Sequence, residues 1–269
     1  MNRFGFITNK YIVSAIILLC LLLTDVILHS GMSRVMIPSS FSKKIKPVSL
    51  PVCNGPLLQK NKRWAGPVEN TGMLQKVPQN TGGILCDVFF DLNKSRFEIY
   101  DDSTRASAVS LDSMLAAFRS RDHSRNLWLE LKNLDTENVA ASLLEMKRLK
   151  NNYGLSGSII VESENPALLK TFCDNGFFTS YLVPFFDPYK ATEKELISFA
   201  DSVRNNLSKY PSSAISGYYF QYPLLKKFFP GYPILTRADN ATISVVSFVF
   251  RRQLENDESI KGVVFPLED

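Results

Sequence analysis

Apolar and polar residues alternate along several short segments of the chain, and longer segments with a helical period separate them. In segment 127–132, one set of alternate residues is apolar and the other set ends in charges: Leu127, Leu129 and Leu131 against Trp128, Glu130 and Lys132. This period of two is typical of a β-strand, because successive side chains point to opposite faces. Segment 159–163, Ile-Ile-Val-Glu-Ser, also carries an acid near its end.

The segments between these strands repeat their apolar residues with a helical period. In the longest, 135–152, an apolar stripe is formed by Val139, Leu143, Leu144, Met146 and Leu149, and Tyr153-Gly154 is a helix stop. The same reading predicts strands at 62–66, 84–91, 127–132, 158–163, 177–183, 214–220, 233–236 and 261–266. It predicts helices at 69–75, 111–118, 135–152, 166–175, 192–210, 224–229 and 241–254, and a hairpin strand at 96–100.

Strands that alternate with helices favour a parallel sheet, and eight such strands predict an α/β fold with one TIM-type (β/α)8 barrel. The extra strand at 96–100 adds a hairpin after the second barrel strand. We place the barrel at residues 57–269, after a linker at 31–56 that is rich in Ser, Pro and Lys. Near Val48 to Pro56 the sequence is equally compatible with an ordered strap that packs against the barrel.

An apolar run at residues 12–28 precedes the linker, and Arg3 and Lys10 precede the run. We interpret residues 1–30 as a membrane anchor or signal segment, with an uncleaved anchor favoured over a cleaved signal and over a buried soluble helix. With its amino terminus inside, the chain would be a single-pass membrane protein whose barrel lies on the extracytoplasmic side. Asp25 then belongs at the outer interface, because a charge is costly in hydrocarbon.

The net charge of +5 is modest, and the chain has neither a basic stripe with interleaved aromatics nor zinc-finger spacing, so we expect no nucleic-acid partner. Of the four cysteines, Cys86 and Cys173 are predicted to be small core residues. A disulfide that involves Cys53 stays open, although no spacing pattern supports it.

Acids recur near the ends of successive predicted strands, at Asp87, Glu130 and Glu162, and Lys132 follows Glu130. The carboxyl ends of barrel strands meet at one face, so these side chains are predicted to share a site there. One interpretation makes the three acids ligands of Mg²⁺ or Ca²⁺, with Lys132 on a polar ligand. The other makes all four a structural ion network.

Several short pieces together resemble the glycerophosphodiester phosphodiesterase barrels and their phospholipase-C-like relatives, over Arg63 to Pro266. They are Trp64-Ala65-Gly66, Ile84-Leu85-Cys86-Asp87-Val88, Tyr100-Asp101-Asp102 and segments 127–132 and 159–163. The resemblance implies a pair of histidines for acid–base work on a phosphodiester and carboxylates around a divalent metal.

The chain departs from this pattern at the expected histidines. Gly66 stands at the first, and Asp101 or Asp102 at the second, while Leu85 replaces a metal-binding glutamate. The chain has two histidines, His29 beside the apolar run and His123 before a strand, and neither position suits catalysis.

Two functions follow from the resemblance, and the missing histidines favour the first. In the first, a diverged, catalytically impaired barrel binds a polar or phosphorylated ligand, or a partner, at the membrane surface. In the second, Asp87, Glu130 and Glu162 work as an active metal-dependent hydrolase, with Asp101 or Asp102 as base. A third interpretation makes Glu130 and Glu162 the acid and base of a glycan-processing barrel.

Overall fold

A computed structural model describes residues 3–36, 41, 45–53, 61–100, 109–119, 126–155, 159–238 and 244–267. The strands are β1 (Arg63–Ala65), β2 (Gly83–Asp91), β3 (Arg96–Ile99), β4 (Leu127–Leu131), β5 (Ile159–Ser163), β6 (Phe178–Leu182), β7 (Ala214–Tyr218), β8 (Ile234–Arg237) and β9 (Ile260–Phe265). The helices are α1 (Arg3–Leu28), α2 (Ser30–Met36), α3 (Met73–Lys76), α4 (Leu111–Arg119), α5 (Val139–Asn152), α6 (Pro166–Cys173), α7 (Glu193–Lys209), α8 (Tyr222–Phe228) and α9 (Val245–Asn256).

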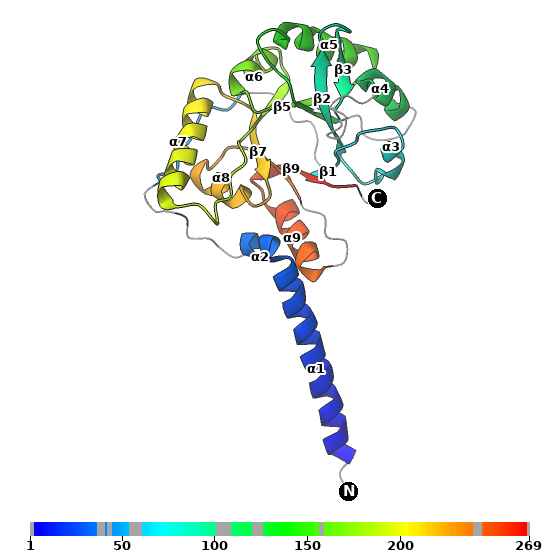
Figure 1. Ribbon diagram of the computed structural model, residues 1–269, viewed down its shortest axis with the longest axis vertical. Helices are drawn as coiled ribbons and strands as arrows, with labels where there is room; N and C mark the ends of the chain where they lie inside the picture. Colours follow the sequence, from blue (N-terminus) through cyan, green and yellow to red (C-terminus); the bar gives the residue numbers. More distant parts are fainter. Residues whose placement is uncertain are drawn as a thin grey trace.

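Eight of the strands form a closed parallel barrel (Figure 1). The sheet runs from β1 through β9, β8, β7, β6, β5 and β4 to β2, and β1 also pairs with β2, which closes the ring. Strand β3 pairs antiparallel with β2 outside this ring. The predicted barrel and its extra hairpin are therefore confirmed.

An apolar layer fills the inside of the barrel. It takes one residue from each barrel strand: Trp64, Leu85, Trp128, Ile160, Phe178, Ala214, Leu235 and Val264. The rings of Trp64 and Trp128 meet edge to face with centroids 5.7 Å apart, a favourable aromatic geometry. The barrel interior is thus a packed core and not a pore, as barrels of eight strands generally are.

The predicted helices form with altered ends. Helix α7 begins where expected, because Thr192 and Glu195 exchange the hydrogen bonds of a capping box. Helix α5 begins at Val139 and not at Asp135, because the Asp135 side chain accepts the backbone N–H of Asn138 in a turn before the helix. Such local carboxylate–backbone bonds compete with the helix itself.

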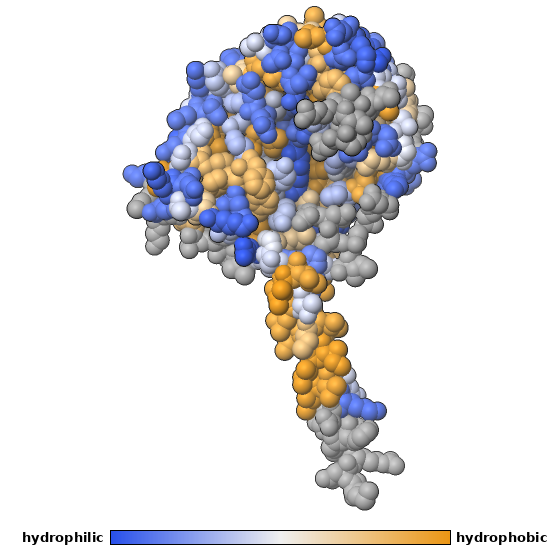
Figure 2. Space-filling view, viewed as in Figure 1, coloured by the Kyte–Doolittle hydropathy of each residue, from blue (hydrophilic) through white to orange (hydrophobic). Residues whose placement is uncertain are grey.

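The amino-terminal helix α1 projects from the barrel as a separate rod with an apolar surface (Figures 1 and 2). Its stretch Lys10–Leu28 is long and apolar enough to cross a membrane, with a mean hydropathy of 2.6, and none of it is buried in the structure.

The segment that follows α1, predicted as a linker, packs against the rest of the protein at several of its described residues. Met32 and Val35 of α2 are buried, as are Phe41 and Ile45. The backbone N–H of Val48 donates to the carbonyl of Phe228 at 3.1 Å, so the segment follows the barrel surface as an ordered strap.

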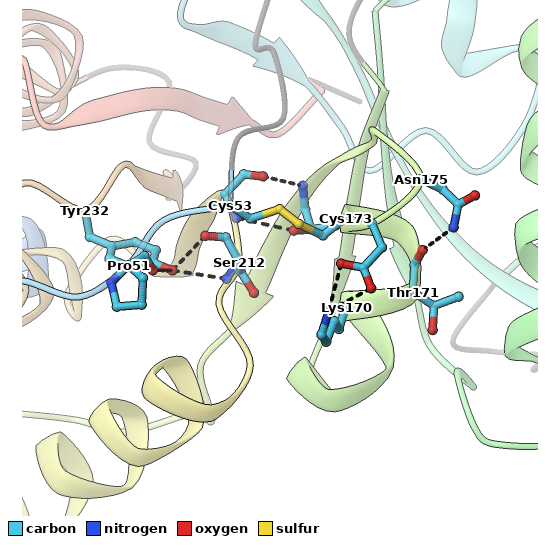
Figure 3. Close-up of a disulfide and its surroundings, with 11 residues drawn as sticks. Pro51, Cys53, Lys170, Thr171, Cys173, Asn175, Ser212 and Tyr232 are labelled. Carbon is cyan, nitrogen blue, oxygen red and sulfur yellow. Dashed lines mark hydrogen bonds and ion pairs between the residues drawn. A yellow bond between two sulfur atoms is a disulfide. The ribbon is translucent and has the colours of Figure 1, made fainter.

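A disulfide joins this strap to the end of α6 (Figure 3). It links Cys53 to Cys173, with Cα atoms 6.5 Å apart, so the disulfide at Cys53 that the sequence left open is present, and the prediction that Cys173 is a small core residue was wrong. Beside it, the Cys53 N–H donates to the carbonyl of Ser212, which also accepts the Tyr232 hydroxyl at 2.7 Å. Cys86 is buried and free, as predicted.

Candidate functional site

A layer of polar side chains lies directly above the apolar layer, toward the carboxyl ends of the barrel strands. Asp87, Glu130 and Glu162 stand at the same level on β2, β4 and β5, because strand register pairs Asp87 with Glu130 and Glu130 with Glu162. Each lies two residues beyond a member of the apolar layer and so points to the same side of its strand. The three predicted acids therefore share one site.

Two cations link the three acids into a chain of ion pairs. Lys132 Nζ lies 2.9 Å from Asp87 Oδ2 and 2.5 Å from Glu130 Oε1. Arg237, at the end of β8, donates from one guanidinium nitrogen to both Glu130 and Glu162. The order Asp87–Lys132–Glu130–Arg237–Glu162 defines what we call the ion chain.

Arg237 is the site residue that sequence reasoning missed. The predicted strand at 233–236 ends just before it, so the prediction left it outside the barrel strands. The signal that could have found it is its place after an apolar strand, where the acids also stand on their own strands. A cation at this level balances acids that would otherwise be buried without partners.

Burial and charge shift the pKa values in the ion chain. Glu162 is completely buried, and burial raises its pKa to about 7, although Arg237 lowers it and Glu130 raises it. Burial also raises the pKa of Asp87, as does Glu130, against the effect of Lys132. Three carboxylates and two cations leave one excess negative charge in the ion chain, which together with burial disfavours the ionised forms of Asp87 and Glu162.

Several buried polar atoms make no hydrogen bond in the structure: Asp87 Oδ1, Glu162 Oε2, Ser180 Oγ and Ser216 Oγ, and Trp128 Nε1 of the apolar layer. Ser216 contributes to lowering the pKa of Glu162, but the two groups do not reach ordinary hydrogen-bond geometry. Buried polar groups are normally satisfied by protein, water or ligand. The polar layer therefore contains several donors and acceptors that the described part of the protein leaves unsatisfied.

A pocket of about 430 Å³ opens beside the ion chain at the carboxyl ends of β4 and β5. Glu130 and Lys132 line one side of it, and the turn that leads into α6 lines the other: Ser163, Glu164, Asn165 and Pro166. The side chain of Lys132 is 29% exposed, whereas that of Glu130 is 9% exposed. Lys132 is therefore the more accessible member of this pair.

Three aromatic side chains gather where β6 and β7 end. Phe185 packs edge to face on Tyr218 and on Phe220, with centroids 5.5 Å apart in each pair. Tyr218 pairs in strand register with Arg237, which places the cluster at the level of the ion chain. Phe185 is 70% exposed, so an apolar surface lies next to the charged one.

The positions at which the resemblance implies histidines carry no imidazole. Gly66 has a φ of +155°, and a Cβ there would lie 2.6 Å from the carbonyl oxygen of Leu85, so this backbone leaves no room for a side chain. Leu85 itself belongs to the apolar layer. Asp101 and Asp102 lie outside the described residues, as does His123. His29 pairs with Asp25, at the end of α1.

The ion chain fits a divalent metal poorly. Within the described ranges, no group of three His, Cys, Asp or Glu side chains is placed to hold a metal ion. Lys132 and Arg237 already bind both carboxylate oxygens of Glu130 and one oxygen each of Asp87 and Glu162, and they place two positive charges where the metal would lie. The predicted Mg²⁺ or Ca²⁺ remains a prediction.

Neither a protein-family model nor a curated protein matches the chain. Among solved structures, it is similar to a proposed glycerophosphodiester phosphodiesterase from Galdieria sulphuraria, with 12% identity, a TM-score of 0.48, and coverage of 77% of this chain and 94% of the other. It is also similar to the glycerophosphodiester phosphodiesterase of Thermotoga maritima, with 14% identity and a TM-score of 0.42. That match covers 72% of this chain and 84% of the other.

A barrel enzyme of different chemistry is equally similar. For N-(5'-phosphoribosyl)anthranilate isomerase from Pyrococcus furiosus, the identity is 14%, the TM-score 0.45, and the coverage 76% of this chain and 86% of the other. The assignment of the barrel therefore rests on this chain's own strand pairing.

Proposed function

We propose that the chain is a membrane-tethered, phosphodiesterase-like barrel that is catalytically impaired and binds a polar or phosphorylated ligand at its mouth. The ion chain is the observation that carries this proposal. A phosphodiesterase needs one group that removes a proton and another that donates one. Here Lys132 forms ion pairs with Asp87 and Glu130. Arg237 forms ion pairs with Glu130 and Glu162.

The ligand we propose combines hydroxyl groups with a phosphate. Asp87 Oδ1 and Glu162 Oε2 are buried acceptors without donors, and a hydroxyl group would supply the missing hydrogen. Lys132, part-exposed beside the pocket, would meet the phosphate. A glycan would satisfy the same acceptors and could stack on the aromatic cluster of Phe185, Tyr218 and Phe220.

The disulfide supports a barrel on the extracytoplasmic side. Disulfides persist mainly in oxidising compartments and are rare in the cytosol. Cys53 and Cys173 both lie after α1 in the chain, on the domain that α1 would anchor. We propose that α1 spans the membrane once and leaves the barrel outside.

An active hydrolase is the second candidate, and one observation favours it. The pKa of Glu162, raised to about 7, suits a general acid or base at neutral pH. Glu162 is completely buried, however, and its Oε1 is bound to Arg237.

Calorimetric titration of the full chain in detergent micelles tests the proposal, with glycerol 3-phosphate, inorganic phosphate and glycerol as probes. We expect glycerol 3-phosphate to bind and the binding to weaken at least about tenfold in Lys132→Met, as loss of a charge-assisted contact implies. Lys147→Met is the matched control, because Lys147 is an exposed lysine on α5 that bonds Asn175.

The same samples are assayed for turnover of glycerophosphodiesters with and without Mg²⁺, Ca²⁺ and Mn²⁺. We expect no turnover. Metal-dependent turnover that disappears in Glu130→Gln would establish the active hydrolase in place of the impaired barrel. Loss of binding in both lysine variants would show that the site lies elsewhere.

A further inference from the structure

The first turn of α9 exposes apolar side chains beside the end of α1. Val245, Phe248 and Val249 are 56%, 60% and 48% exposed. They are spaced as i, i+3 and i+4, so they share one face of the helix. Arg252 follows on that face, and its guanidinium lies 5.1 Å from the centroid of the Phe248 ring. The exposed face thus changes from apolar to cationic within about one turn.

A hydrogen bond fixes the level of this turn relative to α1. Asp25 Oδ2 accepts the backbone N–H of Val246 at 3.1 Å, and His29 Nδ1 lies 2.9 Å from Asp25 Oδ1. Helix α2 also packs along α9, with Met32 and Val35 buried. In Figure 1 the start of α9 lies beside the upper end of α1.

The length of the apolar stretch of α1 then sets the depth of the first turn of α9 in the membrane. Lys10–Leu28 has 19 residues, which span about 28 Å as a helix and so nearly match a hydrocarbon core of about 30 Å. Asp25 lies three residues before Leu28, about 4.5 Å along the helix axis. The first turn of α9 therefore lies at the hydrocarbon boundary when α1 spans the membrane.

We propose that this turn is a second membrane contact of the protein. Val245, Phe248 and Val249 enter the boundary between acyl chains and headgroups, and Arg252 meets the lipid phosphates. Interfacial helices have this division between an apolar face that inserts and basic residues that contact the headgroups. The proposal rests on the membrane-spanning role proposed for α1.

A lipid bilayer fits this face better than a protein partner does. The patch is continuous with the apolar surface of α1, where Ile27 and Leu28 are 71% and 74% exposed (Figure 2). Three side chains make a patch far smaller than the roughly 800 Å² per partner of a stable protein interface. A bilayer around α1 meets the patch without any further association.

The contact would also orient the barrel. Helix α9 follows β8, whose last residue is Arg237 of the ion chain, and in such barrels the helix starts lie at the mouth end. A barrel held by both α1 and α9 would keep this part of its mouth close to the lipid headgroups. The ligand of the mouth would then be one that is present at the membrane surface.

Tryptophan fluorescence in vesicles tests the proposal on the full chain. The native Trp64 and Trp128 are buried inside the barrel and give a background that lipid does not reach. Phe248→Trp reports on the turn, Leu19→Trp on the middle of α1, and Leu144→Trp serves as the control. Leu144 is 68% exposed on α5, which lies at the opposite end of the molecule from α1 (Figure 1).

Each variant is reconstituted in phosphatidylcholine–phosphatidylglycerol vesicles with and without bromine on the acyl chains. We expect brominated lipid to reduce the emission of Phe248→Trp to an extent comparable with Leu19→Trp, and to leave Leu144→Trp unchanged. Quenching at Leu19→Trp alone would overturn the second contact while keeping the anchor. Quenching at neither position would show that α1 does not span the membrane.

A partner protein or a second copy of the chain bound to this face would give a different fluorescence result. The emission of Phe248→Trp would then shift to shorter wavelength without quenching by brominated lipid, and this too would overturn the proposal. Equal quenching at Leu144→Trp would mean that the vesicles bind the barrel without a preferred orientation. That result contradicts a defined contact at α9.

Discussion

Arg237 and Glu162 are hydrogen-bonded across the barrel mouth, although their strands β8 and β5 are not neighbours in the sheet. The carboxylate is completely buried, and the same guanidinium nitrogen also binds Glu130. The bond therefore connects opposite parts of the ring and neutralises charge that burial would otherwise disfavour.

Removing Arg237 should destabilise the protein strongly. Arg237→Ala leaves Glu130 and Glu162 buried without their cation, and we expect a loss of about 3–5 kcal/mol in the free energy of unfolding, measured by urea titration. Arg204→Ala is the control: Arg204 pairs with the half-exposed Asp201, and its loss should cost about 1 kcal/mol or less. Equal losses in the free energy of unfolding would show that the ion chain stabilises the protein no more than the Arg204–Asp201 pair does.

Glu162 should make the stability fall as the pH rises. Its pKa is raised in the folded protein, from 4.5 to about 7, so the folded state binds the proton more tightly than the unfolded state does. This contribution, on the order of 3 kcal/mol, is complete below about pH 4.5 and is lost as the pH rises through about 7.

Urea titrations between about pH 5 and about pH 8 measure this slope. Glu162→Gln should reduce it, because glutamine keeps the shape and does not titrate. Asp87, whose pKa is also raised, should leave a residual slope of the same sign. An unchanged slope in Glu162→Gln would assign the pH dependence to other groups.

Reduction of the disulfide should lower the stability by about 4 kcal/mol, since it closes a long loop in the unfolded chain. Cys53 and Cys173 are separated by 120 residues. We expect Cys53→Ser to reproduce the effect of dithiothreitol on the melting temperature, and dithiothreitol to add nothing in that variant. Cys20→Ser is the control, because Cys20 is an exposed free thiol on α1 and should leave the melting temperature unchanged.

A side chain at position 66 should be poorly tolerated. Gly66→Ala places a Cβ against the backbone of β2 and also requires a φ of +155°, so we expect a loss well above 1 kcal/mol. Gly231→Ala is the matched control, because Gly231 has a φ of +82° and an added Cβ would have no atom within 4 Å. Only the strained backbone conformation should then destabilise the protein, by about 1 kcal/mol.

Urea titration of both glycine variants measures the difference. If Gly66→Ala proves as mild as Gly231→Ala, the strand end is mobile enough to accept a side chain, and a histidine could be introduced there. If it is severe, as we expect, Gly66→His should also be destabilised and should not give phosphodiesterase activity.

The local pattern of the sequence determined the elements and the direction of their side chains. Alternation along 127–132 placed Trp128 and Glu130 on one face, and both lie inside the barrel. The recurrence of an acid at equivalent places on β2, β4 and β5 also predicted the shared level of Asp87, Glu130 and Glu162. Such features can be predicted from the sequence because the backbone geometry of each helix or strand sets the period at which its side chains face one side.

Contacts between distant parts of the chain were decided by the tertiary structure. Arg237 is a single cation after a short strand, and closure of the ring is what brings it to Glu162. The pairing of Cys53 with Cys173, and that of Asp25 with α9, also join segments that no local pattern relates. Periodicity tells which way a side chain points, but its partner depends on how the whole barrel closes and packs.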